Sequence, residues 1–222
     1  MRVNVEQTES GAAGRFIVFE GGDGAGKSTH VRLLVASLRA AGLRVLETRQ
    51  PGGSPLGQQI RDLVLHGGDI TPRAEALLFA ADKAQHVEEV VRPALARGEI
   101  VVSDRYVDSS VAYQGAGRDL GADEVERVQE WAVAGLHPDL TVVIDIAPEE
   151  GRRRRGGEHD RMEREADDFH AAIRAHFLRV AAAAPGRYIV VDGMGDRAVI
   201  HANIVAAVGD RLGLTLEPVA KP

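Results

Sequence analysis

The chain contains no cysteine, which excludes disulfide bonds, cysteine-ligated zinc and a cysteine nucleophile. It also lacks any apolar run that approaches the roughly 20 residues of a membrane-spanning helix, and its polar segment 1–14 has no apolar signal-peptide core. Positive charge is not in excess, because the formal net charge is −6, which argues against general nucleic-acid binding. We expect a cytoplasmic protein with no membrane partner and no nucleic-acid partner.

The chain does have enough length and apolar content for one packed domain. Its 222 residues are 44% hydrophobic and 27% charged, proportions that are ordinary for a soluble globular protein. No internal repeat or linker divides it. We predict a flexible leader over 1–14, a single domain over 15–214 and a C-terminal tail over 215–222.

Five short runs rich in β-branched residues recur along the chain. Most of them are continuously apolar, which is typical of strands buried on both faces of a parallel sheet. Helical segments lie between them, and this alternation implies right-handed crossovers. The predicted fold class is therefore α/β, a three-layer helix–sheet–helix arrangement with a central five-stranded parallel sheet. The runs are residues 15–20, 43–49, 99–104, 140–146 and 187–192.

Apolar positions with helical spacing define two helices. One begins near Ser28, and the other lies late in the chain. The span 71–98 is predicted to be mostly helical, with Thr71 as its N-cap, Pro72 at its first position and Pro93 kinking or restarting it. The apolar faces of the first two helices consist of Val31, Leu34, Val35 and Leu38, and of Met162, Ala166, Phe169, Ile173 and Val180.

The segment "EGGDGAGKST" has the spacing of a phosphate-binding P-loop. It follows a predicted strand and opens a predicted helix, which is the context that this motif requires. Glycines let backbone N–H groups converge on phosphate oxygens, and the helix N-terminus adds its positive end. Lys27 would reach the β- and γ-phosphates, and the Ser28 hydroxyl would reach Mg²⁺. The predicted nucleoside triphosphate site comprises Gly21, Gly22, Asp23, Gly24, Ala25, Gly26, Lys27, Ser28 and Thr29.

Charged residues follow the next strands, at the edge of a parallel sheet where ligands bind. Asp104 ends the third run and is a candidate ligand of Mg²⁺. Asp145 ends the fourth run and is a second candidate, although it could equally cap a loop. Arg49 ends the second run and Arg105 follows Asp104 directly, so two guanidinium groups could clamp one phosphate.

Three further side chains are candidates for a base site. Phe79 could stack on a base, although its apolar helical surroundings favour a place in the core. Tyr113 and Gln114 could supply an aromatic wall and an amide that reads a base edge. Each of these signals is weak when taken alone.

Four consecutive arginines stand between glycines in "GRRRRGGEHDRMERE", residues 151–165. They could form a nucleic-acid patch, a solvated charge run or a closure over a strongly anionic ligand. The nucleic-acid interpretation expects interleaved aromatic residues, and the run has none. Acidic residues also follow it at once, namely Glu158, Asp160, Glu163 and Glu165.

Taken in order, these pieces resemble bacterial thymidylate kinases over nearly the whole chain, from about Arg15 to the last predicted helix. The resemblance rests on "FEGGDGAGKST", "TRQPGGSPLGQQIRDLVL", "LLFAADKAQH", "SDRYVDSSVAYQGAGR" and "HDRMERE". These match the P-loop, the TREPGG-like segment, the helix of the stacking phenylalanine, the DR[YH] motif and the lid of that family. The combination is highly specific, and it implies a P-loop kinase fold with a mobile lid over about 150–164 and a homodimer.

The resemblance also implies a reaction, which is Mg²⁺-dependent transfer of the γ-phosphoryl group of ATP to dTMP. Lys27 and Ser28 would serve ATP and Mg²⁺, and Asp104 would help to place the metal. Lys27, Arg105 and Asp23 would belong to the catalytic set. The implied dTMP site comprises Asp23, Arg49, Pro51, Arg61, Phe79, Lys83, Arg105, Ser110, Tyr113 and Gln114.

Within that site the resemblance assigns individual roles. Arg49 and Arg105 hold the phosphate of dTMP, and Phe79 stacks on thymine. The implied readers of the thymine edge are Ser110 and Gln114. Tyr113 lies near the deoxyribose, where it would crowd a 2′-hydroxyl, Asp23 faces the sugar and phosphate, and Arg61 lies close to the base pocket.

Three positions depart from the family pattern. Lys83 replaces the arginine that most members have after "FAAD", which keeps the charge but loses the planar fork. Gln50 replaces the glutamate of TREP, and Gly24 stands where the eukaryotic-type enzymes carry an arginine. Because the P-loop has no arginine, the resemblance implies that the lid supplies one. The predicted lid residues are Arg153 and Arg155, with Arg161 as a third candidate.

Two other functions are kept as alternatives. Another nucleoside monophosphate kinase or a deoxynucleoside kinase of the same architecture is the nearer one. A nucleoside kinase needs a carboxylate base after the second strand, where this chain has Arg49 and Gln50. A P-loop regulatory nucleotide-binding protein is more remote, because its N-K-x-D base-recognition motif is not present in the sequence.

Overall fold

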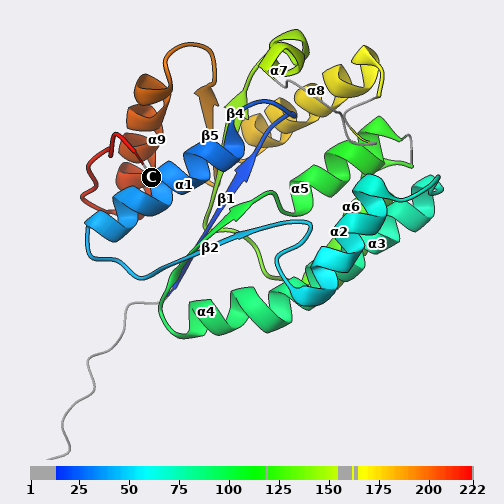
Figure 1. Cartoon of the computed structure of the whole chain (residues 1–222), viewed down its shortest axis with the longest axis horizontal. Coiled ribbons are helices and arrows are strands. Elements are labelled where there is room, and N and C mark those ends of the chain that lie inside the picture. Colours follow the sequence, from blue (N-terminus) through cyan, green and yellow to red (C-terminus); the bar gives the residue numbers. More distant parts are fainter. Residues whose placement is uncertain (1–13, 119, 155–161, 163–164, 222) are drawn as a thin grey trace, which may run out of the picture.

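The computed structural model describes residues 14–118, 120–154, 162 and 165–221. Its centre is a sheet of five parallel strands in the order β2-β3-β1-β4-β5 (Figure 1). Each of the five predicted runs forms one of these strands, so the predicted sheet is confirmed. The strands are β1 Arg15–Glu20, β2 Val45–Arg49, β3 Ile100–Asp104, β4 Leu140–Asp145 and β5 Tyr188–Asp192.

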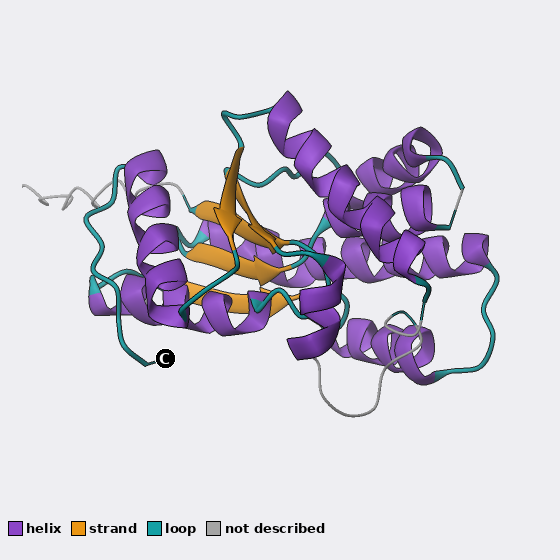
Figure 2. Cartoon of the chain, turned by 90° about the horizontal axis from the view of Figure 1, so that it is seen from above, coloured by secondary structure: helices purple, strands orange, loops and turns teal. Residues whose placement is uncertain are grey.

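Helices connect the strands and cover both faces of the sheet, as Figure 2 shows from above. None of the described helices is long and apolar enough to cross a membrane. The helices are α1 Lys27–Ala40, α2 Pro55–His66, α3 Pro72–His86, the π-helix η1 Val87–Val91, α4 Arg92–Ala96, α5 Val107–Ser110, the π-helix η2 Val111–Gly117, α6 Ala122–Val133, α7 Pro148–Arg154, α8 Asp167–Ala183 and α9 Arg197–Leu212.

The central strand β1 shows why its sequence is apolar without alternation. Ile17 and Phe19 face the α1–α9 side, where they belong to one buried cluster. Phe16 and Val18 face the opposite side and belong to a cluster that contains Val91 of η1. Both faces of the strand are covered, as expected for a parallel sheet between two helical layers.

The span 71–98 is helical, as predicted, but it is not one regular α-helix. Pro72 is the first residue of α3, and Thr71 holds the N-cap position without a capping hydrogen bond from its side chain. The helix widens into η1 at Val87 and continues as α4 from Arg92, with Pro93 at its second position. A proline ring conflicts with the carbonyl one turn earlier, and a wider π-turn relieves that conflict.

The late helix begins later than its apolar spacing predicted. Met162 lies in a turn, and Ala166 is the N-cap of α8, which starts at Asp167. Asp167 and Asp168 occupy the first helical turn, where carboxylates interact favourably with the helix dipole. Met162 is nevertheless buried, so its apolar character reflects packing rather than membership of the helix.

The strand order brings the functional segments together. β1 lies between β3 and β4, and Phe19 is in register with Asp104. Asp104 is also in register with Arg49 at the end of β2. The P-loop that follows β1 therefore lies beside the residues that end β2 and β3, at the carboxyl edge of the sheet.

Candidate active site

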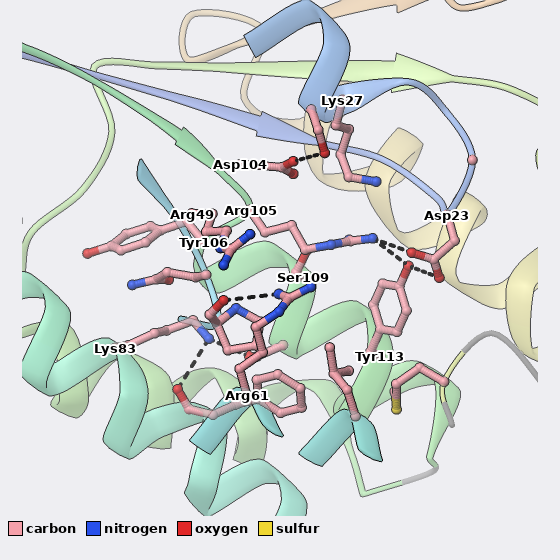
Figure 3. A pocket seen from close by; sticks show the side chains of 18 of the residues that line it. Asp23, Lys27, Arg49, Arg61, Lys83, Asp104, Arg105, Tyr106, Ser109 and Tyr113 are labelled. Atoms are coloured by element: carbon pink, nitrogen blue, oxygen red, sulfur yellow. Dashed lines mark hydrogen bonds and ion pairs between the residues drawn. The ribbon is translucent and has the colours of Figure 1, made fainter. Parts of the chain in front are cut away.

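A cavity of about 550 Å³ opens at this edge of the sheet. Figure 3 shows Lys27 on one side of it, Lys83 and Arg61 on the opposite side, and Arg105 between them. The excess of positive charge favours anionic ligands. Among the described residues that line the cavity, the charged ones are Lys27, Arg49, Arg61, Lys83, Arg105 and Arg154 against Asp23 and Asp104.

The P-loop wraps around the start of α1 in a conformation that requires glycine at specific points. Gly21 has a φ of 133°, and a Cβ there would overlap the Ile144 carbonyl oxygen. The Lys27 ammonium turns back and donates to the carbonyl oxygens of Gly21 at 2.9 Å and Gly22 at 2.7 Å. Burial and the nearby Arg105 lower the pKa of Lys27 to about 8, so an anionic ligand would stabilise its charged form.

Ser28 and Asp104 form the part of the site that fits a divalent cation. The Ser28 hydroxyl donates to Asp104 Oδ2 at 2.5 Å, joining the first turn of α1 to the end of β3. Hydroxyl and carboxylate oxygens suit Mg²⁺, which completes its shell with water and phosphate oxygens. No group of three or more His, Cys, Asp or Glu side chains able to hold a metal occurs in the described residues. Asp145, the second candidate, instead accepts two hydrogen bonds from Arg174 at 2.7 and 2.8 Å.

Arg105 is held in an unusual conformation that directs it across the cavity. Its φ is 71°, in the left-handed region that costs a non-glycine residue energy. Its NH2 group lies 2.5 Å from Asp23 Oδ1 and 3.1 Å from the Tyr113 hydroxyl (Figure 3). The Tyr113 hydroxyl donates to Asp23 Oδ2 at 2.7 Å. Burial raises the pKa of Tyr113 well above its usual value, which keeps the hydroxyl a donor.

Two residues that the sequence did not single out hold this conformation of Arg105. Glu20 is fully buried and accepts from the backbone N–H groups of Tyr106 and Ser109 at 2.8 and 3.1 Å. The Ser109 hydroxyl donates to Glu20 at 2.5 Å and accepts from Arg105 NH1 at 2.9 Å. Burial and the nearby Asp108 raise the pKa of Glu20 to about 7. The loop after β3 is therefore tied to the end of β1 by one carboxylate.

The segment after β2 forms another wall of the cavity. Arg49 NH2 donates to Gln58 Oε1 at 3.2 Å, and Arg61 NH1 donates to the Pro51 carbonyl at 3.1 Å. Gln50, one of the three departures from the family pattern, is buried, and its amide nitrogen lies 2.7 Å from Nδ1 of His86.

His86 connects this wall to β2. An amide nitrogen can only donate, so Nδ1 accepts from Gln50 and the ring proton lies on Nε2. Nε2 then donates to the Thr48 hydroxyl at 2.7 Å. Burial and the nearby Lys83 lower the pKa of His86 to about 4. A neutral histidine therefore pairs with the neutral amide that stands in place of the family's glutamate.

The predicted base-reading residues converge at the end of the cavity that lies away from the P-loop. Phe79 belongs to a buried cluster and also lines the cavity; its stacking on a base stays a prediction. The Lys83 ammonium is buried, donates to the Ser110 hydroxyl at 2.7 Å, and lies 5.6 Å from the centre of the Phe79 ring. Burial lowers the pKa of Lys83 to about 8. Gln114 lines the same end.

The described part of the predicted lid starts with α7, which packs directly on the P-loop. A Cβ at Gly24 would overlap the carbonyl oxygen of Gly151, and a Cβ at Gly151 would overlap the carbonyl oxygen of Asp23. Arg154 lines the cavity, and its Nε donates to Glu150 Oε1 at 2.5 Å. Arg153 does not line the cavity and forms two hydrogen bonds to the same carboxylate at 2.7 and 2.8 Å. The other two predicted lid arginines, Arg155 and Arg161, lie outside the described residues.

The predicted dTMP residues line this cavity together with Ser28, Asp104 and most of the P-loop. Gly21, Gly22 and Ala25 belong to the loop but do not line the cavity, and neither does Arg153. The site residues to which the sequence analysis gave no role are Glu20, Leu65, Tyr106, Ser109, Arg154 and Met162. All except Arg154 lie within the segments that carry the family resemblance, but nothing in those segments assigns a role to these individual residues.

A P-loop facing a second cationic cluster at the carboxyl edge of a parallel sheet defines the class of a P-loop phosphotransferase. The family model "Thymidylate kinase" matches residues 19–204. The chain is 55% identical over 197 residues to a thymidylate kinase of Clavibacter sepedonicus, covering 87% of this chain and 93% of that protein. It is 54% identical over 193 residues to a thymidylate kinase of Cutibacterium acnes, covering 86% and 94%. The chain belongs to the thymidylate kinase family.

Proposed function

We propose that this protein transfers the γ-phosphoryl group of ATP to dTMP, giving ADP and dTDP. One cavity is lined both by Lys27 of the P-loop and by Arg105, which follows β3. The proposal rests on this observation. Donor and acceptor are both anions, and converging cations offset their repulsion. The family to which the chain belongs supports thymidylate as the acceptor.

The acceptor phosphate needs no catalytic base. Its second pKa is near ~6, so at neutral pH it is largely deprotonated and can attack directly. The protein's task is then to align the two phosphates and to neutralise charge on the moving group. Lys27 serves the donor side, and Arg49 and Arg105 serve the acceptor side.

The cluster of Asp23, Arg105 and Tyr113 would also fix the sugar. Because Tyr113 donates to Asp23 and lies under the Arg105 guanidinium, 5.0 Å from its ring centre, its ring has little freedom to move. We propose that it stands against the deoxyribose, where a 2′-hydroxyl would be crowded. Asp23 both holds Arg105 and faces the sugar and phosphate.

The metal site that we propose consists of Ser28, directly, and Asp104, directly or through water. Mg²⁺ bound there would supply positive charge to the β- and γ-phosphate oxygens. The 2.5 Å bond between the two side chains keeps both oxygens beside the P-loop.

Arginines of the lid would complete the charge around the transferred group, because Gly24 provides none. Arg154 lines the cavity and is therefore a candidate that geometry favours. Arg153 and Arg155 remain proposals for the same role, with Arg161 after them. Arginines that reach a transferring phosphoryl group contribute on the order of 10³–10⁵ in rate.

The test is a coupled ADP-release assay with dTMP, dCMP, dGMP and AMP as acceptors. We expect dTMP to be strongly preferred. Equal rates with the other monophosphates would refute the acceptor assignment, and no rate with any of them would refute the kinase assignment.

We further propose that the enzyme is a cytoplasmic homodimer. Trp131 of α6 is 84% exposed and Leu77 of α3 is 60% exposed. Both line an apolar groove between α3 and α6, a surface that a second copy could cover. Light scattering of the wild type and of Trp131→Glu tests this, since the variant should shift the protein toward monomer.

A further inference from the structure

Glu75 is a buried acid at the base end of the cavity to which no role has yet been given. It lies in the first turn of α3 and has no exposed surface. Its Oε1 accepts a hydrogen bond from Gln114 Nε2 at 2.9 Å and lies 3.5 Å from Arg118 Nε. A buried carboxylate is destabilising unless it is paired and hydrogen-bonded, so each of its partners matters.

Arg118 is the cation that pairs with this acid. Besides Glu75, it pairs with Glu165 at 2.6 Å, and its guanidinium lies 5.3 Å from the centre of the Phe169 ring. The cation is therefore held from several sides next to the Glu75 carboxylate. An ionised carboxylate accepts hydrogen bonds and cannot donate them.

The orientation of the Gln114 amide follows from this chemistry. Because Glu75 only accepts, Gln114 must turn its NH₂ group toward Glu75, and its Oε1 is the amide atom left for the cavity. A glutamine with a partner able to both donate and accept could turn either way, since the two amide orientations have nearly the same shape. Glu75 thus decides whether the cavity wall presents an acceptor or a donor at this point.

Two side chains near Gln114, those of Lys83 and Ser110, present hydrogen-bond donors instead of an acceptor. Lys83 brings a buried ammonium that only donates, and it donates to the Ser110 hydroxyl at 2.7 Å. Ser110 lies four residues before Gln114, on successive helical turns. Lys83 and Ser110 therefore present donors beside the acceptor of Gln114. Thymine offers an O4 acceptor next to an N3–H donor, whereas cytosine offers an N4 amino donor next to an N3 acceptor.

We propose that Glu75 is a specificity-determining positioning residue, which fixes the Gln114 amide so that the cavity accepts a 4-keto pyrimidine and rejects a 4-amino pyrimidine. The inference rests on the proposed function and adds a residue that does not itself touch the nucleotide. Rejection is strong because a turned base would leave buried polar groups on both sides without partners.

The experiment compares dTMP with 5-methyl-dCMP, which has the same sugar, phosphate and methyl group and differs only on the 4-keto and N3 edge. The measured quantity is the ratio of the two kcat/KM values. In Glu75→Gln the new amide can donate or accept, Gln114 is free to turn, and we expect the preference for dTMP to fall at least about tenfold. In the exchanged pair E75Q/Q114E, position 114 is again an obligatory acceptor, and the preference should return.

The control is Asp82→Asn, which removes another buried carboxylate from the same helix. Asp82 lies about two turns along α3 from Glu75 and accepts from the Gly52 backbone N–H at 3.0 Å. Its charge acts on Lys83, but it does not hold the Gln114 amide, so this variant should retain the preference for dTMP. Gln114→Leu removes the amide and leaves the Glu75–Arg118 pair in place. It should lose the preference, and a preference that survives in it overturns the role of Glu75 even if Glu75→Gln does not fold.

The outcomes distinguish a failure of the proposed function from a failure of the role given to Glu75. A wild-type enzyme that does not phosphorylate dTMP would overturn the proposed function itself. If the wild type prefers dTMP but Glu75→Gln or Gln114→Leu keeps the full preference, only the role of Glu75 is overturned. A preference lost in Glu75→Gln and regained in the exchanged pair supports it.

Discussion

The buried His86 makes the stability of this protein sensitive to acid. Its side chain is fully buried, and burial together with Lys83 lowers its pKa from 6.5 to about 4. The second proton would have to enter at Nδ1, which faces the donating amide of Gln50. The neutral ring is therefore favoured in the folded protein, while the unfolded chain takes up a proton freely below pH 6.5.

The size of the effect follows from proton linkage. A histidine pKa that is lowered on folding contributes stability that is fully present above pH 6.5 and is lost as the pH falls toward 4. Between pH 7 and pH 5 a shift of this size removes about 2 kcal/mol from the free energy of unfolding. His86→Asn has no imidazole to protonate, so its stability lacks this dependence on pH. At pH 7 the substitution should lower the free energy of unfolding by about 2–3 kcal/mol, because Thr48 and Gln50 lose buried hydrogen-bond partners.

The assay is urea unfolding of the wild type and of His86→Asn at pH 7, 6 and 5. We expect the difference between their free energies of unfolding to shrink by about 2 kcal/mol from pH 7 to pH 5, where it should be near zero. Val91→Ala, a buried apolar truncation in the adjoining η1, should keep a constant gap to the wild type. A His86→Asn gap that is the same at pH 7 and pH 5 would refute the assignment of a neutral, hydrogen-bonded His86.

Three further outcomes are expected from the site. Gly151→Ala should lower kcat at least about tenfold in steady-state assays, because its Cβ would overlap the Asp23 carbonyl and displace the P-loop; an unchanged kcat would mean that α7 does not rest on the loop during turnover. Both arginines pair with Glu150, but of the two Arg154 alone lines the cavity. Arg154→Ala should therefore lower kcat at least about a hundredfold, whereas Arg153→Ala should change it far less; equal effects would contradict this geometry. Asp104→Asn should raise the Mg²⁺ concentration needed for half-maximal activity about tenfold or more, which a magnesium titration at saturating substrate measures, and an unshifted titration would remove Asp104 from the metal site.

The sheet and the P-loop could be predicted from sequence because their signals are local. Each strand is a short apolar run, and the loop between Gly21 and Ser28 combines fixed spacing with a strand before it and a helix after it. The base end of the cavity was different. Phe79, Lys83 and Gln114 carry weak signals alone, and only the resemblance to a family indicated that they act together.

Other features of the site could not have been predicted, for physical reasons. Glu20 looks like an ordinary strand end, and its partner Ser109 is 89 positions away in the sequence. The left-handed backbone of Arg105 has no marker, because that conformation is imposed by tertiary contacts on a residue that does not favour it. The phase of α7 was also hidden, since a run of identical arginines has no periodicity that could distinguish Arg153 from Arg154.

The contact between Gly24 and Gly151 has a consequence for how such enzymes can change over evolutionary time. Neither position tolerates a side chain while α7 rests on the P-loop, because each Cβ would overlap the other segment's backbone. An arginine could therefore not be moved from the lid to position 24 by one substitution; the helix would first have to retreat. The position of the proposed lid arginine and the position of α7 would therefore have to change together, and we expect these two glycines to covary among related chains.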